Sequence, residues 1–145
     1  MRLVVQRVAG AEVSVDGRPV GKIGAGMVVL AGVEVGDGPE QVDTAAAKLV
    51  GLRFFDDERG RMNVDVRRSG GSVLLVSQFT LAASTRKGRR PSFDRAAPPE
   101  VAEPLLGELR RRLEAAGVRV ECGRFGVRMR VDLVNDGPVT FVLDF

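Results

Sequence analysis

Two apolar runs constrain the fold of this chain more than any other feature. Residues 27–35 read MVVLAGVEV and residues 72–81 read SVLLVSQFTL. Each run is too short to span a membrane as a helix. Residues 27–35 predict a β-strand that is buried on both faces, and residues 72–81 predict a second very apolar strand that gains polar side chains at Ser77, Gln78 and Thr80. With 145 residues, 44% of them hydrophobic, the chain can bury a sizeable core in one domain, residues 1–145.

The rest of the chain predicts more strands and two helices. Apolar residues recur at helical spacing after Pro39, and again from Pro99 to a stop at Gly117. Because strands outnumber helices about three to one and the helices are far apart, we expect an α+β fold: a curved, mostly antiparallel sheet or barrel-like sheets with two main helices. The further strands are expected at residues 1–8, 11–15, 20–23, 52–55, 63–66, 118–122, 129–134 and 139–143.

The composition excludes several kinds of chemistry. The chain has no histidine and a single cysteine, Cys122. Catalytic triads built on histidine and zinc sites built on imidazole or paired thiolates are therefore excluded. We expect no cofactor and no metal, so any acid–base chemistry must come from carboxylates, lysine, backbone dipoles or the substrate.

The chain also carries no recognisable targeting segment. Its first ten residues, MRLVVQRVAG, are too short an apolar stretch and too interrupted by charge for a secretory signal. A lone cysteine fits a reducing compartment. We therefore expect a cytoplasmic protein with no membrane association.

The first candidate site is the sequence Ser77-Gln78-Phe79-Thr80 at the end of the second apolar run. Polar side chains at a strand end can simply bond to local backbone, but they can also form the rim of an active site. Ser77 or Thr80 could be proposed as a nucleophile. Without a histidine to accept the proton, neither hydroxyl has an obvious activator.

A second candidate is a basic loop. Residues 86–95 contain five basic residues and one acidic residue, so this segment carries +4 while the whole chain carries +3. Such a loop is either a solvated surface or a phosphate-binding surface, and the sequence favours neither. The basic residues that we single out here are Arg86, Lys87, Arg89 and Arg90.

The third candidate is Asn135-Asp136-Gly137-Pro138. Between two predicted strands this sequence is most simply a hairpin turn. Only ~5 to 6% of X-Pro bonds in folded proteins are cis, so spacing alone predicts a trans turn.

Several of these motifs together resemble one family. The chain carries SQFTL at 77–81 and NDGPVT at 135–140, with QRV at 6–8, RPSF at 90–93 and GRF at 123–125. In this order and at this length they resemble the D-aminoacyl-tRNA deacylases over essentially the whole chain.

The resemblance implies a homodimer whose active sites lie at the subunit interface. Such an enzyme hydrolyses the ester between a D-amino acid, or glycine mischarged on the alanine tRNA, and the 3′-terminal adenosine of tRNA. In this family the Gly137–Pro138 peptide is cis and reaches into the partner subunit's pocket, where its carbonyl oxygens exclude an L side chain. The substrate's own 2′-hydroxyl activates the attacking water, which fits a chain without histidine.

The resemblance also assigns roles to residues. The backbone N–H groups of Phe79 and Thr80, with the hydroxyls of Ser77 and Thr80, would stabilise the oxyanion, and Gln78 would hold the pocket. Other residues would support the Gly-Pro loop or contact the terminal adenosine. These are Arg7 and Asn135 for the loop, and Phe125 and Met129 for the adenosine.

Two alternatives stay open at this point. One is an RNA-binding module without catalysis that uses only the basic loop. The other is an esterase of small D-amino-acid esters with Thr80 as its nucleophile.

Overall fold

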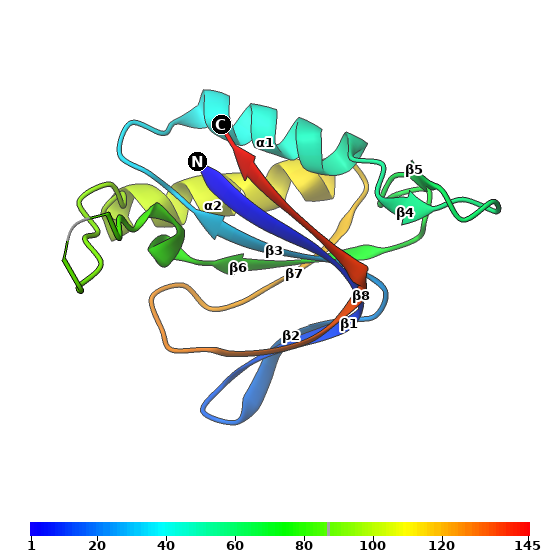
Figure 1. Ribbon diagram of the computed structural model, residues 1–145, viewed down its shortest axis with the longest axis horizontal. Helices are drawn as coiled ribbons and strands as arrows, with labels where there is room; N and C mark the ends of the chain where they lie inside the picture. Colours follow the sequence, from blue (N-terminus) through cyan, green and yellow to red (C-terminus); the bar gives the residue numbers. More distant parts are fainter. Residues whose placement is uncertain (87) are drawn as a thin grey trace.

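The computed structural model describes residues 1–86 and 88–145 (Figure 1). In these residues one six-stranded sheet curves into a nearly closed barrel, and two helices cover one side of it. The helices are α1 (Pro39–Gly51) and α2 (Pro99–Ala115), and a short 3-10 helix, η1, spans Phe79–Ala82. The strands are β1 (Arg2–Val15), β2 (Arg18–Ile23), β3 (Gly26–Gly32), β4 (Phe55–Asp56), β5 (Met62–Val64), β6 (Ser72–Ser77), β7 (Arg119–Cys122) and β8 (Arg130–Asp144).

The sheet is mixed. Strand β1 pairs antiparallel with β2, β3 and β8, whereas β3, β6 and β7 run parallel. The parallel half arises because α1 lies in the connection from β3 to β6 and α2 in that from β6 to β7, and such crossovers return the chain in the same direction. The predicted α+β class and curved sheet with two helices are thus confirmed, and the parallel half was not foreseen.

Two apolar clusters lie on opposite faces of the sheet. Leu3 and Val5 of β1 join the cluster between sheet and helices, whereas Val8 and Val13 join the one enclosed by the curve of the sheet. Strand β3 contributes to both clusters and its residues 27–29 are fully buried. The prediction that residues 27–35 form a strand buried on both faces is therefore confirmed for its central residues, whereas Val35 at its end is 67% exposed.

Several predicted boundaries were wrong. The first two predicted strands are one continuous strand, β1, and the strand predicted to reach Leu81 ends at Ser77, where the chain turns into η1. The β4–β5 hairpin is shorter than expected and is displaced along the chain. Polar side chains from Ser77 onward explain the early end of β6, because the chain leaves the core there.

The hairpin turn predicted at Asn135–Pro138 was also wrong. Strand β8 is a single strand whose Thr140 lies opposite Gln6 and whose Asn135 lies opposite Val8. Four residues of β8 thus face the one residue Arg7, which makes a large bulge in the middle of the strand. Both halves of β8 pair with the same long strand, so no reversal of the chain is needed.

None of the helices in the described residues is long and apolar enough to cross a membrane.

The tightest backbone packing in the sheet generates a stability prediction. A Cβ on Gly26 would overlap the carbonyl oxygen of Ser72 and lie 2.7 Å from its amide nitrogen. Gly26→Ala should therefore lower the free energy of unfolding by about 1 to 3 kcal/mol in denaturant titrations. Gly24→Ala is the matched control, because a Cβ there meets nothing within 4 Å. Equal stability of the two variants would contradict this account of β3–β6 packing.

Candidate active site

The candidate site begins at the C-terminal end of β6. Ser77 is half-buried and lies opposite Ala31 of β3, and the amide of Gln78 donates to the carbonyl of Ala31 at 2.8 Å. The chain then enters η1, so the N–H groups of Phe79 and Thr80 have no partner within that helix. The Gln78 side-chain amide donates to the Thr80 hydroxyl. Two backbone donors are thus held at a rigid strand end.

An apolar cavity of about 300 Å³ opens beside this strand end. Ser77, Gln78 and Phe79 line one side of it, and the start of α2 lines another. Phe125 closes a third side, and none of the described residues that line the cavity is charged. Phe125 therefore lines the same cavity as the predicted catalytic residues Ser77, Gln78 and Phe79. The side chain of Thr80 is exposed and does not line this cavity.

Met129 does not lie with Phe125. Its sulfur accepts a hydrogen bond from the amide of Arg124 at 3.3 Å, and its side chain packs against the apolar cluster enclosed by the sheet. The structure thus places Met129 behind the segment that carries Phe125, in a supporting position. Met129 is not among the residues that line this cavity, and its predicted contact with the terminal adenosine stays a prediction.

The basic loop follows η1. Arg86, Arg89 and Arg90 are exposed, and they make no ion pair with any other residue that the structure describes. Lys87, the fourth predicted basic contact, lies outside the described residues. Two exposed aromatic rings stand at the base of this loop, Phe79 (58% exposed) and Phe93 (40% exposed), with centroids 5.1 Å apart.

The bulge in β8 forms another region of the candidate site. The Gly137–Pro138 peptide bond is cis, and both residues are exposed. The side chain of Asn135 closes the bulge, because its oxygen accepts from the amide of Val139 at 2.9 Å and its nitrogen donates to the Thr140 hydroxyl at 3.0 Å. Asn135 therefore holds the loop through both ends of its side-chain amide.

Arg7 holds the bulge from the other side. Among the described residues, Arg7 is the one charged residue that is buried, with 7% of its surface exposed. Its Nε donates to the carbonyl of Asp136 at 3.0 Å, and its Nη1 donates to the carbonyl of Phe54 at 2.9 Å and to the carboxylate of Asp56 at 3.2 Å. A Cβ on Gly137 would lie 3.2 Å from the other guanidinium nitrogen, so the loop is packed directly on Arg7.

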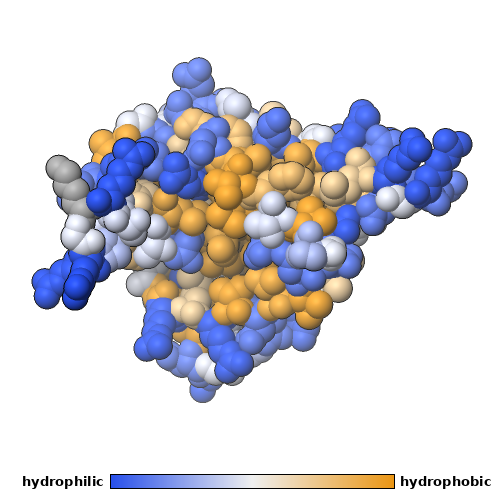
Figure 2. Space-filling view, viewed as in Figure 1, coloured by the Kyte–Doolittle hydropathy of each residue, from blue (hydrophilic) through white to orange (hydrophobic). Residues whose placement is uncertain are grey.

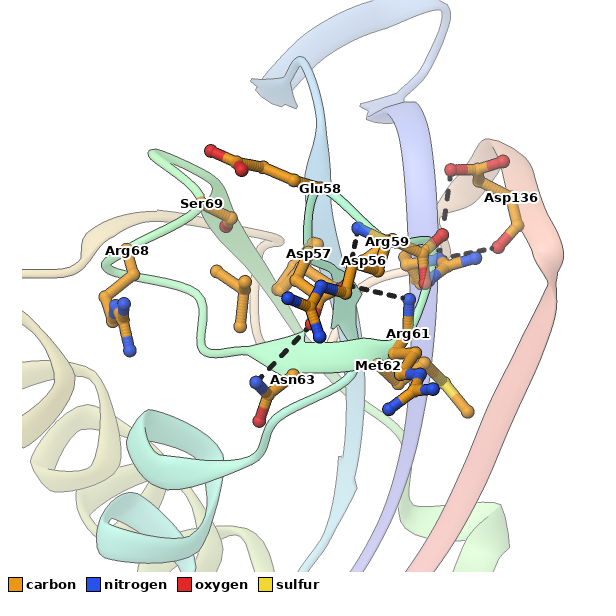
Figure 3. Close-up of a pocket in the computed structure, with 13 residues that line it drawn as sticks. Asp56, Asp57, Glu58, Arg59, Arg61, Met62, Asn63, Arg68, Ser69 and Asp136 are labelled. Carbon is orange, nitrogen blue, oxygen red and sulfur yellow. Dashed lines mark hydrogen bonds and ion pairs between the residues drawn. The ribbon is translucent and has the colours of Figure 1, made fainter.

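An open groove of about 1010 Å³ adjoins Arg7 and Asp136 (Figure 3). Arginines and acidic residues line it in equal number. Backbone amides of Arg61 and Arg59 donate to Asp57 and hold the pKa of that carboxyl below its ordinary value. The groove is therefore mixed in charge: Asp57 holds the β4–β5 turn, and Asp56 and Asp136 pair with Arg7.

The β6 end and the β8 bulge lie far apart within one chain. Strands β1 and β3 stand between β8 and β6, and the bulge is level with the start of β6, whereas Ser77 is at its end. Strand spacing and rise place the two regions on the order of 20 Å from each other. Figure 1 shows the bend of β8 and the end of β6 at opposite ends of the sheet.

Cys122 is not an activated nucleophile. Burial raises the pKa of its thiol above the ordinary value. The thiol is therefore protonated at neutral pH, and a protonated thiol is a weak nucleophile.

Comparison with known proteins identifies the family. A family profile described as D-Tyr-tRNA(Tyr) deacylase matches residues 4–144. The D-aminoacyl-tRNA deacylase of Symbiobacterium thermophilum is 55% identical over 144 residues, which cover 99% of this chain and 95% of that protein. This chain belongs to the D-aminoacyl-tRNA deacylase family.

Other relatives agree with that assignment. The D-aminoacyl-tRNA deacylase of Bacillus licheniformis is also 55% identical, over 99% of this chain and 98% of that protein. The deacylase described here is therefore a hydrolase of the aminoacyl-tRNA ester bond, with tRNA as its substrate.

Solved structures share the fold of this deacylase. A structure described as the c-Myc DNA Unwinding Element Binding Protein matches with a TM-score of 0.94 at 37% identity, covering 100% of this chain and 99% of that one. A structure described as a probable eukaryotic D-amino acid tRNA deacylase matches with a TM-score of 0.87 at 19% identity, covering 99% and 98%.

The sequence did not reveal every residue of the site. No local sequence pattern points to the partners of Arg7, which lie on β4 and in the β8 bulge. The same holds for the wall that α2 adds to the cavity. Asp56 lies on β4, and its carboxylate accepts a hydrogen bond from Arg7. The residues that complete the cavity wall are Ala96, Ala97, Pro99, Ala102 and Leu106.

Replacing Arg7 tests its hold on the bulge. Arg7→Met leaves the Phe54 carbonyl without its buried donor and releases Asp136, so we expect a loss of about 2 to 4 kcal/mol in unfolding free energy. We also expect D-aminoacyl-tRNA hydrolysis to fall at least tenfold. Arg2→Met on the same strand removes an exposed pair with Asp144 and a long hydrogen bond to Leu81, and should cost under about 1 kcal/mol. Similar effects of the two changes would show that Arg7 has no special structural role.

The basic loop generates a second prediction. Replacing Arg89 and Arg90 with alanine should raise KM for the tRNA substrate. It should also make the slope of log kcat/KM against log salt concentration shallower by about one to two, which corresponds to the loss of one to two phosphate contacts. The rate at saturating substrate should change little. Arg67→Ala with Arg68→Ala is the matched control pair. An unchanged salt slope in the Arg89 and Arg90 variant would identify the loop as a solvated surface.

Proposed function

We propose that this deacylase acts as a homodimer in which each active site combines the β6 end of one subunit with the β8 bulge of the other. Its substrates are D-aminoacyl-tRNA and glycine mischarged on the alanine tRNA, and L-aminoacyl-tRNA is rejected. The observation that carries this proposal is the separation of the two regions within one chain. A two-fold symmetric pair brings the β6 end of each subunit to the β8 bulge of its partner, in both sites at once.

The terminal adenosine occupies the apolar cavity. Its base lies against Phe125, since aromatic side chains bind unstacked bases well. The ester carbonyl then lies at the cavity mouth, beside the first residues of η1. The N–H groups of Phe79 and Thr80, which are unpaired within η1, donate to the oxyanion that forms when water attacks the carbonyl carbon.

The ribose supplies the base that the protein lacks. The 2′-hydroxyl accepts a hydrogen bond from the attacking water and relays its proton toward the 3′-oxygen as the carbon–oxygen ester bond breaks. The products are a free amino acid and a tRNA with an intact 3′-hydroxyl. The protein contributes positioning and oxyanion stabilisation, the two effects that a site without histidine can provide.

The surface around β8 supports the dimer. This strand is the edge of the sheet next to β1, and Val134 and Val142 on it are 63% and 61% exposed. Figure 2 shows apolar side chains gathered across the middle of the face on which β8 lies. An edge strand beside exposed apolar side chains is a surface that a partner subunit can cover.

Chirality is selected by exclusion. In the dimer the carbonyl oxygens of Gly137 and Pro138 occupy the space that the side chain of an L-amino acid needs. Asn135 and Arg7 keep those oxygens in place. Glycine has no side chain to exclude, so it is accepted together with D-amino acids.

One alternative is binding of nucleic acid without hydrolysis. It draws on the solved structure with 37% identity, which is described as a protein that binds a DNA element, and on the exposed basic loop. An assay with matched D- and L-aminoacyl-tRNA separates the two functions, because a binding module releases no amino acid from either. We expect hydrolysis of the D substrate at least a hundredfold faster than that of the L substrate.

The roles of Thr80 and the ribose can be tested together. Thr80→Ala should keep more than about a tenth of the activity, because backbone donors remain at the oxyanion. A D-aminoacyl-tRNA that ends in 2′-deoxyadenosine should be cleaved at least a hundredfold more slowly by the unmodified enzyme. Loss of all activity in Thr80→Ala with full cleavage of the deoxy substrate would favour a Thr80 nucleophile.

A further inference from the structure

A second cavity, of about 330 Å³, adjoins the apolar one. It lies between α2 and the segment that follows β7, and it shares Ser77, Leu106 and Phe125 with the first cavity. Phe125 therefore belongs to the lining of two adjoining cavities of similar size. Nothing in the chemistry proposed above uses the second one.

The second cavity differs from the first in charge. Glu103, Arg110 and Arg124 line it, whereas the described lining of the first cavity is uncharged. Arg110 donates to Glu114 at 2.8 Å and is thus already paired. Neither Glu103 nor the guanidinium of Arg124 forms an ion pair or hydrogen bond with another described residue. The cavity therefore offers an exposed carboxylate and an exposed guanidinium that have no partner among the described residues, together with the aromatic residue Phe125.

We propose that this second cavity binds the cytidine that precedes the terminal adenosine of the tRNA. The proposal rests on the proposed function, which places the adenosine in the first cavity. Phe125 then lies between two consecutive bases, an arrangement typical of single-stranded RNA recognition. Arg124 pairs with the phosphate that links the two nucleotides.

Glu103 makes this subsite specific for cytosine. A carboxylate accepts a hydrogen bond from the exocyclic amino group of cytosine. Uracil carries a carbonyl oxygen at the same position, and that oxygen faces the carboxylate as a second acceptor. The site therefore prefers cytidine over uridine, and a side-chain amide at position 103 can donate to uracil and remove the preference.

The experiment compares three substrates that carry the same D-amino acid. They are the natural tRNA, a tRNA with uridine in place of the penultimate cytidine, and D-aminoacyl-adenosine alone. For the unmodified enzyme we expect kcat/KM about tenfold lower with the uridine substrate than with the natural one. Glu103→Gln should reduce this preference to less than about threefold, as one hydrogen bond changes its direction.

Arg124→Ala should raise KM about five- to tenfold for both tRNA substrates, in line with the loss of one charged hydrogen bond. Its effect should be confined to substrates that contain the internucleotide phosphate. Glu100→Gln, one turn earlier on α2, and Arg119→Ala on β7 are matched controls that line neither cavity. Both should keep the cytidine preference and the KM of the unmodified enzyme.

Two results would overturn the proposal. One is an unmodified enzyme that cleaves the cytidine and uridine substrates equally well. The other is a Glu103→Gln or Arg124→Ala enzyme that loses the same activity on D-aminoacyl-adenosine as on tRNA, which would indicate a structural role. The preference of the unmodified enzyme for D over L substrate is measured in parallel, so failure of the subsite is distinguishable from failure of the proposed function.

Discussion

The guanidinium of Arg7 donates to three groups in two separate segments of the chain: the carbonyl of Phe54 and the carboxylate of Asp56 in one, and the carbonyl of Asp136 in the other. Removing a buried cation of this kind leaves carbonyls without donors, which costs more than the net gain from any one of its hydrogen bonds. Because Arg7 faces the four bulged residues of β8, the position of the Gly137–Pro138 peptide depends on it. The geometry that we propose for chiral selection thus rests on a side chain in β1, far along the sequence from that peptide.

The sequence predicted the class of fold and the segment at the end of β6 because these depend on local patterns. Continuous apolar runs predict buried strands, and helical spacing that follows a proline predicts α1 and α2, with Gly117 as the stop of α2. The bulge of β8 could not be predicted in this way. Asn-Asp-Gly-Pro between two apolar stretches has the local pattern of a hairpin, and only the pairing of both stretches with the single long strand β1 excludes one.

Some site residues can be found from a local motif, and others are brought together only by the fold. Ser77, Gln78 and Phe79 follow one another in sequence, so a single motif points to them. The apolar cavity needs α2, β3 and the segment that follows β7, which meet only through the parallel half of the sheet. The position of Met129 also needs the structure, because its sulfur accepts a hydrogen bond from the amide of Arg124 and the residue is not among those that line the cavity. A match at one position of a motif therefore does not fix the orientation of a side chain a few residues away.

The central claim is that each active site is shared between two subunits, and subunit complementation tests it most directly. Phe79→Pro removes one proposed oxyanion donor at the first residue of a helix, where proline is tolerated. Gly137→Val adds a side chain where even a Cβ lies 2.6 Å from Val139 and 3.2 Å from Arg7. We predict that each variant is inactive alone and that random mixing of the two restores about a quarter of the wild-type activity, since half of the dimers are mixed and each has one intact site. A mixture that exchanges subunits and stays inactive would contradict a shared site.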